Sequence, residues 1–194
     1  MASELSAPKG VRALRRKVRL TEHEGDVWQL AGGNGVGKTS LLRAFARLAR
    51  IEVFGRLERC EDVLYSGHSA ALKGALTPRQ NLMTHPSGLN APSDLAIDTA
   101  LEAVGVLGHA DVQTARLSAG QKRRVALARL FLPSPRLWLL DEPFTALDVQ
   151  GVKVLEARFL EHAHSGGAVV FTSHQSAALG DELKVLNLEH YCGD

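Results

Sequence analysis

Aromatic residues, cysteines and long apolar runs are all scarce in this chain of 194 residues. Only 5% of the residues are aromatic, and the two cysteines, Cys60 and Cys192, stand far apart without a C-x-x-C pair. Neither a zinc site nor a disulfide framework is therefore indicated. No apolar run approaches the ~18 to 20 residues that a membrane-spanning helix needs, and Met1 to Gly10 has no apolar signal-peptide core. We expect a cytoplasmic chain.

The charge balance is close to neutral, with a formal net charge of +2 at pH 7, and gives no argument for a nucleic-acid partner. A hydrophobic fraction of 45% is ordinary for a globular protein. The length suits one domain, which we expect to span residues 1–194. A basic cluster at residues 12–19 is interpreted as a solvated edge strand or first-strand fragment rather than a membrane-surface element.

The most informative stretch fits the phosphate-binding pattern G-x-x-x-x-G-K-[ST] in full: Gly32, Gly33, Asn34, Gly35, Val36, Gly37, Lys38 and Thr39. The preceding residues 27–31 are mostly apolar, as in a buried strand, and apolar residues after the loop recur at helical spacing through Leu48 and Ala49. A glycine-rich turn at a helix N-terminus directs N–H groups and the helix dipole towards an anion. The sequence therefore predicts a phosphate site, with Ser40 among its contacts.

Two side chains of this loop have predicted roles. The Lys38 ammonium would reach the terminal phosphates of a nucleotide, and the Thr39 hydroxyl would coordinate Mg²⁺.

Two acidic residues follow the apolar segment Leu137–Leu140, which is typical of a buried strand. Ligands bind at the carboxyl ends of such strands, and carboxylates buried there are costly unless they have partners. We expect Asp141 to reach Mg²⁺ directly or through water, and Glu142 to orient the water that attacks a phosphate.

Two histidines follow other predicted strands. His174 lies two residues after the predicted strand at 168–172, and His68 follows the predicted strand at 63–65. At the carboxyl edge of a parallel sheet, His174 could contact a terminal phosphate and His68 could face the same site. Alone, either would be an ordinary loop histidine.

The stretch at about residues 69–117 predicts a helical insertion within an α/β domain. Thr77 and Pro78 suit the N-cap and first position of a helix, and residues 93–106 carry apolar side chains, Leu95 among them, at helical spacing. Residues 117–121, Leu-Ser-Ala-Gly-Gln, then precede a helix that is basic near its start, against the helix dipole. Two interpretations stay open: an anion binds at that helix start, or the helix is merely solvated and basic.

The order of these motifs resembles that of the ATP-binding subunit of ABC transporters over nearly all of residues 25–175. The matching parts are a Walker A loop at 32–39, a signature at 117–121, a Walker B strand ending at Asp141 with Glu142 beside it, a D-loop at 146–148 and a switch residue, His174. The signature discriminates best, because other P-loop enzymes lack it.

The resemblance implies a P-loop NTPase fold, a mostly parallel sheet flanked by helices, that binds ATP and Mg²⁺. Two ATP molecules would be sandwiched between two subunits packed head to tail. Each would be held by one Walker A loop and by the partner's Ser118, Gly120 and Gln121. The resemblance further implies that a homodimer, peripheral on the cytoplasmic face of the bacterial inner membrane, drives permease subunits on separate chains.

Hydrolysis in this family is an in-line attack of water on the γ-phosphate. The residues that the resemblance assigns to it are Glu142, His174, Lys38 and His68.

Within the family, the likeness is nearest to the heme exporter subunit of cytochrome c maturation systems. It is carried by residues 65–68, by Ala119 in the signature and by residues 140–148. These cues favour a subunit of that transport system, although the sequence does not name the transported substrate.

Three departures from the family pattern are visible. No aromatic residue stands upstream of Trp28 to stack on adenine, so Trp28 or an apolar contact must substitute. The segment between Lys38 and His68 is shortened. His68 stands where most relatives carry glutamine, and imidazole suits softer metals than Mg²⁺.

Two other functions are compatible with the motifs. One is a regulatory module that binds ATP with little turnover, which the shortened N-terminal half favours and the intact Lys38, Asp141, Glu142 and His174 disfavour. The other is a soluble ABC-type ATPase of DNA repair or translation, for which the stretch between Thr39 and Ser118 is too short to hold a long coiled coil.

Overall fold

A computed structural model of the chain describes residues 3–5, 24–49, 53–55, 63–84 and 91–191. The chain falls into two compact units. The first is formed by residues 1–65, 136–142 and 159–194, and the second by residues 66–135 and 143–158. The basic cluster at residues 12–19 lies outside the described residues.

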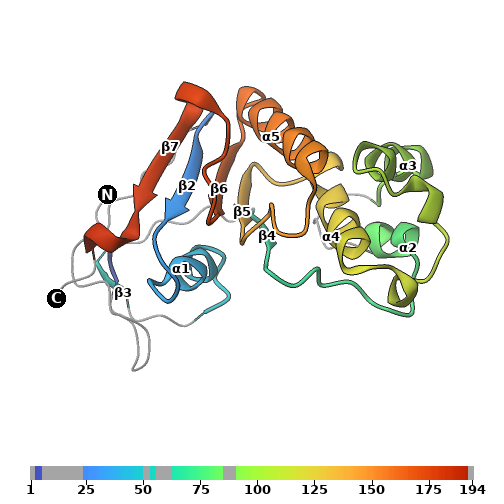
Figure 1. The fold of residues 1–194 in the computed structure, drawn as a ribbon, viewed down its shortest axis with the longest axis horizontal. Coiled ribbons are helices and arrows are strands. Elements are labelled where there is room, and N and C mark those ends of the chain that lie inside the picture. Colours follow the sequence, from blue (N-terminus) through green and yellow to red (C-terminus); the bar gives the residue numbers. More distant parts are fainter. Residues whose placement is uncertain (1–2, 6–23, 50–52, 56–62, 85–90, 192–194) are drawn as a thin grey trace. The chain divides into compact units, whose positions relative to one another are not determined.

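The first unit is built on a parallel sheet. In the described residues this sheet has five strands in the order β4-β5-β6-β2-β7 (Figure 1). The strands are β2 (Val27–Ala31), β4 (Val63–Ser66), β5 (Leu137–Leu140), β6 (Ala168–Thr172) and β7 (Leu183–Asn187). β2 pairs in parallel with β6 and β7, and β5 pairs in parallel with β6. The predicted α/β fold is confirmed; a separate antiparallel pair joins β1 (Ser3–Leu5) to β3 (Val53–Gly55).

One face of the sheet packs on α1 (Lys38–Phe45). Leu139 and Val170 from the central strands share a core with Leu41 and Leu42 of that helix. Successive side chains of a strand point to opposite faces of the sheet. The strand neighbours of Leu139 and Val170 therefore point to the other face, where a second helix can cover them.

The other face of the sheet meets the second half of α5 (Val149–His164). Trp138 stacks on His162 with ring centroids 3.7 Å apart, and Phe171 lies 5.4 Å from Phe159. Helices on both faces explain why β5 and β6 are buried at every position.

The first helix is shorter than its apolar pattern predicted. α1 ends at Phe45, and Arg47 adopts a left-handed conformation with φ of 58°. The Leu48 N–H then bonds to Arg43 O at 2.8 Å and the Arg47 N–H to Ala44 O at 3.2 Å, which is a Schellman ending. Leu48 consequently leaves the buried face and is 61% exposed, so the predicted helical pattern does not extend to it.

The second unit is mainly helical. Its helices are α2 (Pro78–Met83), α3 (Asp94–Ala103), α4 (Ala119–Ala128) and the first part of α5, with 3-10 turns at Leu107–His109, Thr114–Arg116 and Arg129–Phe131. The predicted cap of α2 is confirmed: Thr77 and Gln80 form a reciprocal capping box, and Pro78 is the first helical residue.

The core of this unit lies between α2, α3 and α4. Its members from α3 are Ile97, Ala100 and Leu101, which share one helical face, and the C-cap residue Val104 adds to them. Leu95 is 77% exposed, contrary to prediction, because it precedes Ile97 by two residues and therefore lies on nearly the opposite side of the helix.

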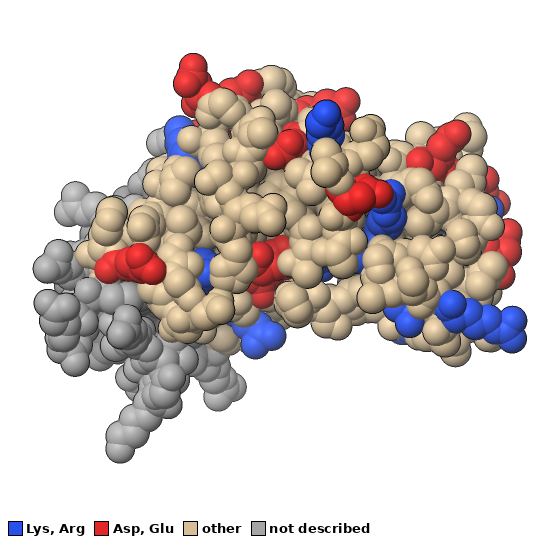
Figure 2. Space-filling view, in the orientation of Figure 1, with Lys and Arg blue, Asp and Glu red and all other residues tan. Residues whose placement is uncertain are grey.

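No described helix combines the length and the apolar character needed to cross a membrane. On the face drawn in Figure 2, acidic and basic side chains are scattered singly and in small groups among uncharged surface.

A tight contact in the first unit yields a stability prediction. A Cβ added at Gly167 would overlap the ring of His162, which is held between Trp138 and the carbonyl of Arg136, 2.8 Å from Nε2. Gly167→Ala should therefore lower the free energy of unfolding by about 1–3 kcal/mol in a denaturant titration. Gly108→Ala is the control, because no atom lies within 4 Å of its added Cβ. Equal unfolding midpoints for the two variants would show that the contact is not restrictive.

Candidate functional site

The glycine-rich loop at residues 32–39, the phosphate loop, joins β2 to α1 as predicted (Figure 1). Gly32, Gly35 and Gly37 have φ angles of 134°, 79° and 106°, which residues with a Cβ rarely adopt. Gly37 immediately precedes α1, and no side-chain hydrogen bond from Gly37 caps the helix. The loop therefore directs the first N–H groups of α1 towards an anion.

Lys38 lies folded over this loop. Its ammonium donates to the carbonyl oxygens of Gly32 at 2.5 Å and Gly33 at 3.3 Å, and the residue is 8% exposed. An ammonium has three donor hydrogens, so these bonds fix its position at the loop.

Asp141 directly follows β5 and is hydrogen-bonded to two threonines. The Thr39 hydroxyl lies 3.0 Å from both carboxylate oxygens of Asp141, and the Thr172 hydroxyl donates to Oδ1 at 2.9 Å. Asp141 is only 3% exposed. A carboxylate this deeply buried needs such donors, and Thr39 and Asp141 together present oxygen ligands of the kind that Mg²⁺ prefers.

Glu142 has a strained backbone beside this network. Its φ is 50°, in the left-handed region, and its N–H donates to the Thr172 hydroxyl at 2.8 Å. Strain of this kind costs about 1–3 kcal/mol and persists where the surroundings enforce it. The Glu142 carboxylate lies 3.6 Å from Nε2 of His174, a side chain that is 55% exposed.

Thr172, which is fully buried, is a further residue of the site that was not predicted from the sequence. Strand register could have indicated it: Leu140 of β5 is paired with Phe171 of β6, so Asp141 and Thr172 are the next residues on adjacent strands. The polar end of an otherwise apolar strand was the available signal.

Two further contacts of the site were also missed. Buried Gln29 in β2 donates to the carbonyl of Gln175 at 2.9 Å and so holds the chain just after His174. The Glu189 carboxylate accepts a hydrogen bond from the Gly33 N–H at 2.7 Å. Glu189 lies far from the loop in sequence and has no local motif, so only the pairing of β2 with β7 brings the two together.

The predicted signature lies in the second unit, at the start of α4. Ser118 is the N-cap, and it forms a capping box with Gln121 in which Ser118 N–H donates to Gln121 Oε1 at 2.9 Å. The Gln121 amide also contacts His109 at 3.0 Å. A Cβ added at Gly120 would lie 3.4 Å from the carbonyl of Ala146, so the signature and the D-loop touch inside this unit.

The basic residues of α4 are not a solvated face, so that interpretation was wrong. Lys122 donates to the Ala115 carbonyl at 3.3 Å, Arg123 to the Gly67 carbonyl at 3.1 Å, and Arg124 to Asp148 at 2.7 Å. Internal acceptors therefore account for this positive charge.

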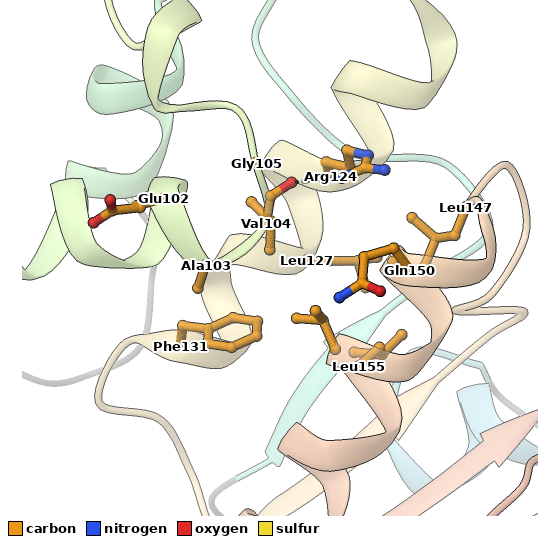
Figure 3. A pocket seen from close by; sticks show the side chains of 12 residues that line it. Glu102, Ala103, Val104, Gly105, Arg124, Leu127, Phe131, Leu147, Gln150 and Leu155 are labelled. Carbon is orange, nitrogen blue, oxygen red and sulfur yellow. Dashed lines mark hydrogen bonds between the residues drawn. The ribbon is translucent and has the colours of Figure 1, made fainter.

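A cavity of about 230 Å³ lies in the second unit, and Arg124 is among the residues that line it (Figure 3). Its walls are largely apolar and come from α3, α4 and the start of α5, with Leu127 and Leu147 among them. It contains none of the predicted nucleotide ligands. His68 also belongs to the second unit and is exposed.

Trp28 lies early in β2, towards the strand end opposite the phosphate loop. Its indole N–H donates to Asp26 at 3.1 Å, and the Lys184 ammonium lies 5.6 Å from the ring centroid. These contacts explain the tryptophan structurally, and they leave the predicted adenine contact unassigned among the described residues.

Comparison with known proteins identifies the class that this geometry belongs to. The family model described as ABC transporter matches residues 15–145. The chain therefore belongs to the ABC transporter family, and it is an ATP-binding subunit of that family.

Two relatives of this chain share one description. The "Cytochrome c biogenesis ATP-binding export protein CcmA" of Idiomarina loihiensis is 42% identical, covering 97% of this chain and 92% of the relative. The protein of the same description from Pseudomonas syringae is 44% identical, covering 90% and 87%. Among solved structures, a candidate ABC transporter ATP-binding protein from Pyrococcus furiosus superimposes with a TM-score of 0.80 at 25% identity, covering 99% of this chain and 98% of that one.

The hydroxyl of Thr172 can be tested by an isosteric change. Thr172→Val removes the donor to Asp141 and the acceptor for the Glu142 N–H, and should cost about 1–3 kcal/mol of unfolding free energy because buried polar groups lose their partners. Thr172→Ser keeps the hydroxyl and should be affected less. A serine variant as unstable as the valine variant in chemical denaturation would contradict this role.

The carboxylate of Glu189 should weaken the affinity of the loop for phosphate. Glu189→Gln keeps an acceptor for the Gly33 N–H but removes the negative charge. We expect ATP to bind ~2- to 5-fold tighter, ADP to gain less and adenosine to gain nothing, since exposed charges contribute up to about 1 kcal/mol. Titration calorimetry at low and high salt measures this, with Asp181→Asn, an exposed acid in the same unit, as control. An equal gain for adenosine would exclude an electrostatic origin.

Proposed function

We propose that this chain hydrolyses ATP to drive a separate membrane permease of the kind that serves cytochrome c biogenesis. One observation carries the proposal: Asp141 is hydrogen-bonded to Thr39 of the phosphate loop, while Glu142 and His174 meet at neighbouring strand ends. The names of the relatives, which describe ATP-binding export proteins of cytochrome c biogenesis, support the choice of transport system.

The phosphate loop would bind the phosphates of ATP. The N–H groups at the start of α1 would donate to phosphate oxygens, and Lys38 would exchange its carbonyl acceptors for the terminal phosphates. The other predicted contacts are Gly32, Gly33, Asn34, Gly35, Val36, Gly37, Thr39 and Ser40.

Glu142 and His174 would act on the γ-phosphate. Glu142 would accept a hydrogen bond from the attacking water and so orient it in line with the leaving group. His174, whose Nε2 lies 3.6 Å from that carboxylate, would donate to a γ-phosphate oxygen and stabilise its developing charge. The strained backbone of Glu142 and its bond to Thr172 would keep the carboxylate in place.

The residues at the end of β5 fit a magnesium ion. Thr39 and Asp141, whose oxygens lie 3.0 Å apart, would hold the ion, which supplies positive charge to the phosphates when bound. Within the described ranges no group of three or more His, Cys, Asp or Glu residues is suited to a metal, so phosphate and water oxygens would complete the coordination.

The signature would act in trans. In a head-to-tail dimer, the start of α4 with Ser118, Gly120 and Gln121 would face the γ-phosphate bound to the partner subunit. His68 would link hydrolysis to the helical segment at about 69–117, and that segment would contact permease subunits at the cytoplasmic face of the inner membrane. Residues 1–194 would then function as a single ATP-binding domain.

The decisive experiment is light scattering of the Glu142→Gln variant with and without MgATP. The amide should slow hydrolysis at least 100-fold and trap ATP, so the variant should shift from monomer to dimer only with ATP. Glu102→Gln, the same change in the second unit, should hydrolyse ATP like the wild type.

The contrary outcomes are informative. Turnover of the wild type no higher than that of Glu142→Gln would exclude the hydrolytic function and support a regulatory nucleotide-binding module. ATP binding without dimerisation of Glu142→Gln would exclude a homodimer.

A further inference from the structure

The loop from Gly67 to Thr77 connects β4 to α2 without any helix or strand of its own. It carries His68 near its start. Because such a loop has no backbone ladder, its conformation depends on the side chains that bind its carbonyl oxygens.

Arg123 of α4 binds the start of this loop. Its Nη1 donates to the carbonyl oxygens of Gly67 at 3.1 Å and His68 at 3.4 Å. The residue is only 5% exposed, so a full positive charge is held inside the second unit. A buried guanidinium is retained only where acceptors compensate it, and two successive carbonyl oxygens are among the acceptors here.

Arg129, at the start of the 3-10 turn that follows α4, binds the same loop. Its Nη2 donates to the Ala71 carbonyl at 3.1 Å, and Ala71 has a φ of 48°, in the left-handed region. Burial lowers the pKa of Arg129. A strained alanine next to a desolvated guanidinium shows that the loop conformation is enforced rather than relaxed.

The far half of the loop is fixed independently of α4. Asn81 donates to the carbonyls of Lys73, Leu76 and Thr77, and the Thr114 hydroxyl donates to those of Lys73 and Leu76. The two arginines therefore hold only the half that contains His68.

We propose that Arg123 is a positioning residue that fixes the His68 half of the loop to α4, the helix whose N-terminus carries Ser118 and Gly120. The inference rests on the proposed function, in which His68 links hydrolysis to the helical segment and the signature acts on ATP bound to the partner subunit. With Arg123 in place, the two elements move as one body. Without it, the loop samples other conformations, and only a fraction of molecules present both elements correctly.

The test combines kinetics with hydrogen exchange on the full chain. Arg123→Met should raise amide exchange across residues 67–72 and lower kcat about 10- to 100-fold, the effect of one charge-assisted hydrogen bond. The KM for ATP should stay within about 2-fold, because Lys38, Thr39 and Asp141 contact none of the altered groups. Residues 73–77, whose carbonyls are bound by Asn81 and Thr114, should exchange their amides as in the wild type.

Arg123→Lys keeps the charge but offers one ammonium in place of a planar fork, so it should give smaller changes of the same kind. This variant also serves if the methionine variant does not fold. Arg116→Met, an exposed arginine of the same unit, is the control and should change neither readout.

Unchanged exchange at residues 67–72 in both Arg123 variants would overturn the proposal. So would a loss of kcat in Arg123→Met with no change of exchange there. A wild type without ATP turnover would refute the proposed function instead, and the exchange measurement would still decide whether Arg123 holds the loop.

Discussion

The site depends on one buried carboxylate. Asp141 sits at the end of β5 with almost no exposure to water, and it is stabilised by hydroxyl donors from the phosphate loop and from β6. Three chain segments are thereby fixed to each other at the carboxyl edge of a parallel sheet, where α/β proteins bind their ligands. Thr172 extends the network to the backbone of Glu142, so the residue that would orient water is positioned by the residue that would hold the metal.

The second unit uses positive charge in a comparable way. The three basic residues near the start of α4 are directed at carbonyl oxygens and at Asp148 rather than at solvent. Asp148 in turn accepts the Gly151 N–H at 2.7 Å and so caps α5. The helix that carries the signature is thus tied to the D-loop and to the His68 loop, which makes it the organising element of this unit.

The sequence predicted the parts whose signals are local. The glycine pattern at 32–39, the apolar strands and the cap at Thr77 are set by neighbouring residues, and the structure has them as predicted. Thr172 and Glu189 could not be found in this way, because strand order and register bring them to the site. The first helix was predicted to continue to Leu48, and this was wrong for a different reason. Arg47 adopts a left-handed conformation that ends the helix, and an arginine in the sequence does not indicate that conformation.

The contacts of Lys38 affect the enthalpy of nucleotide binding. The ammonium is already bonded to the carbonyls of Gly32 and Gly33, so an arriving phosphate exchanges one set of acceptors for another. The measured enthalpy would then be a difference between two sets of hydrogen bonds, smaller than the strength of the new contacts alone. Discrimination between nucleotides at this lysine therefore depends on how well each phosphate group outcompetes the loop's own backbone.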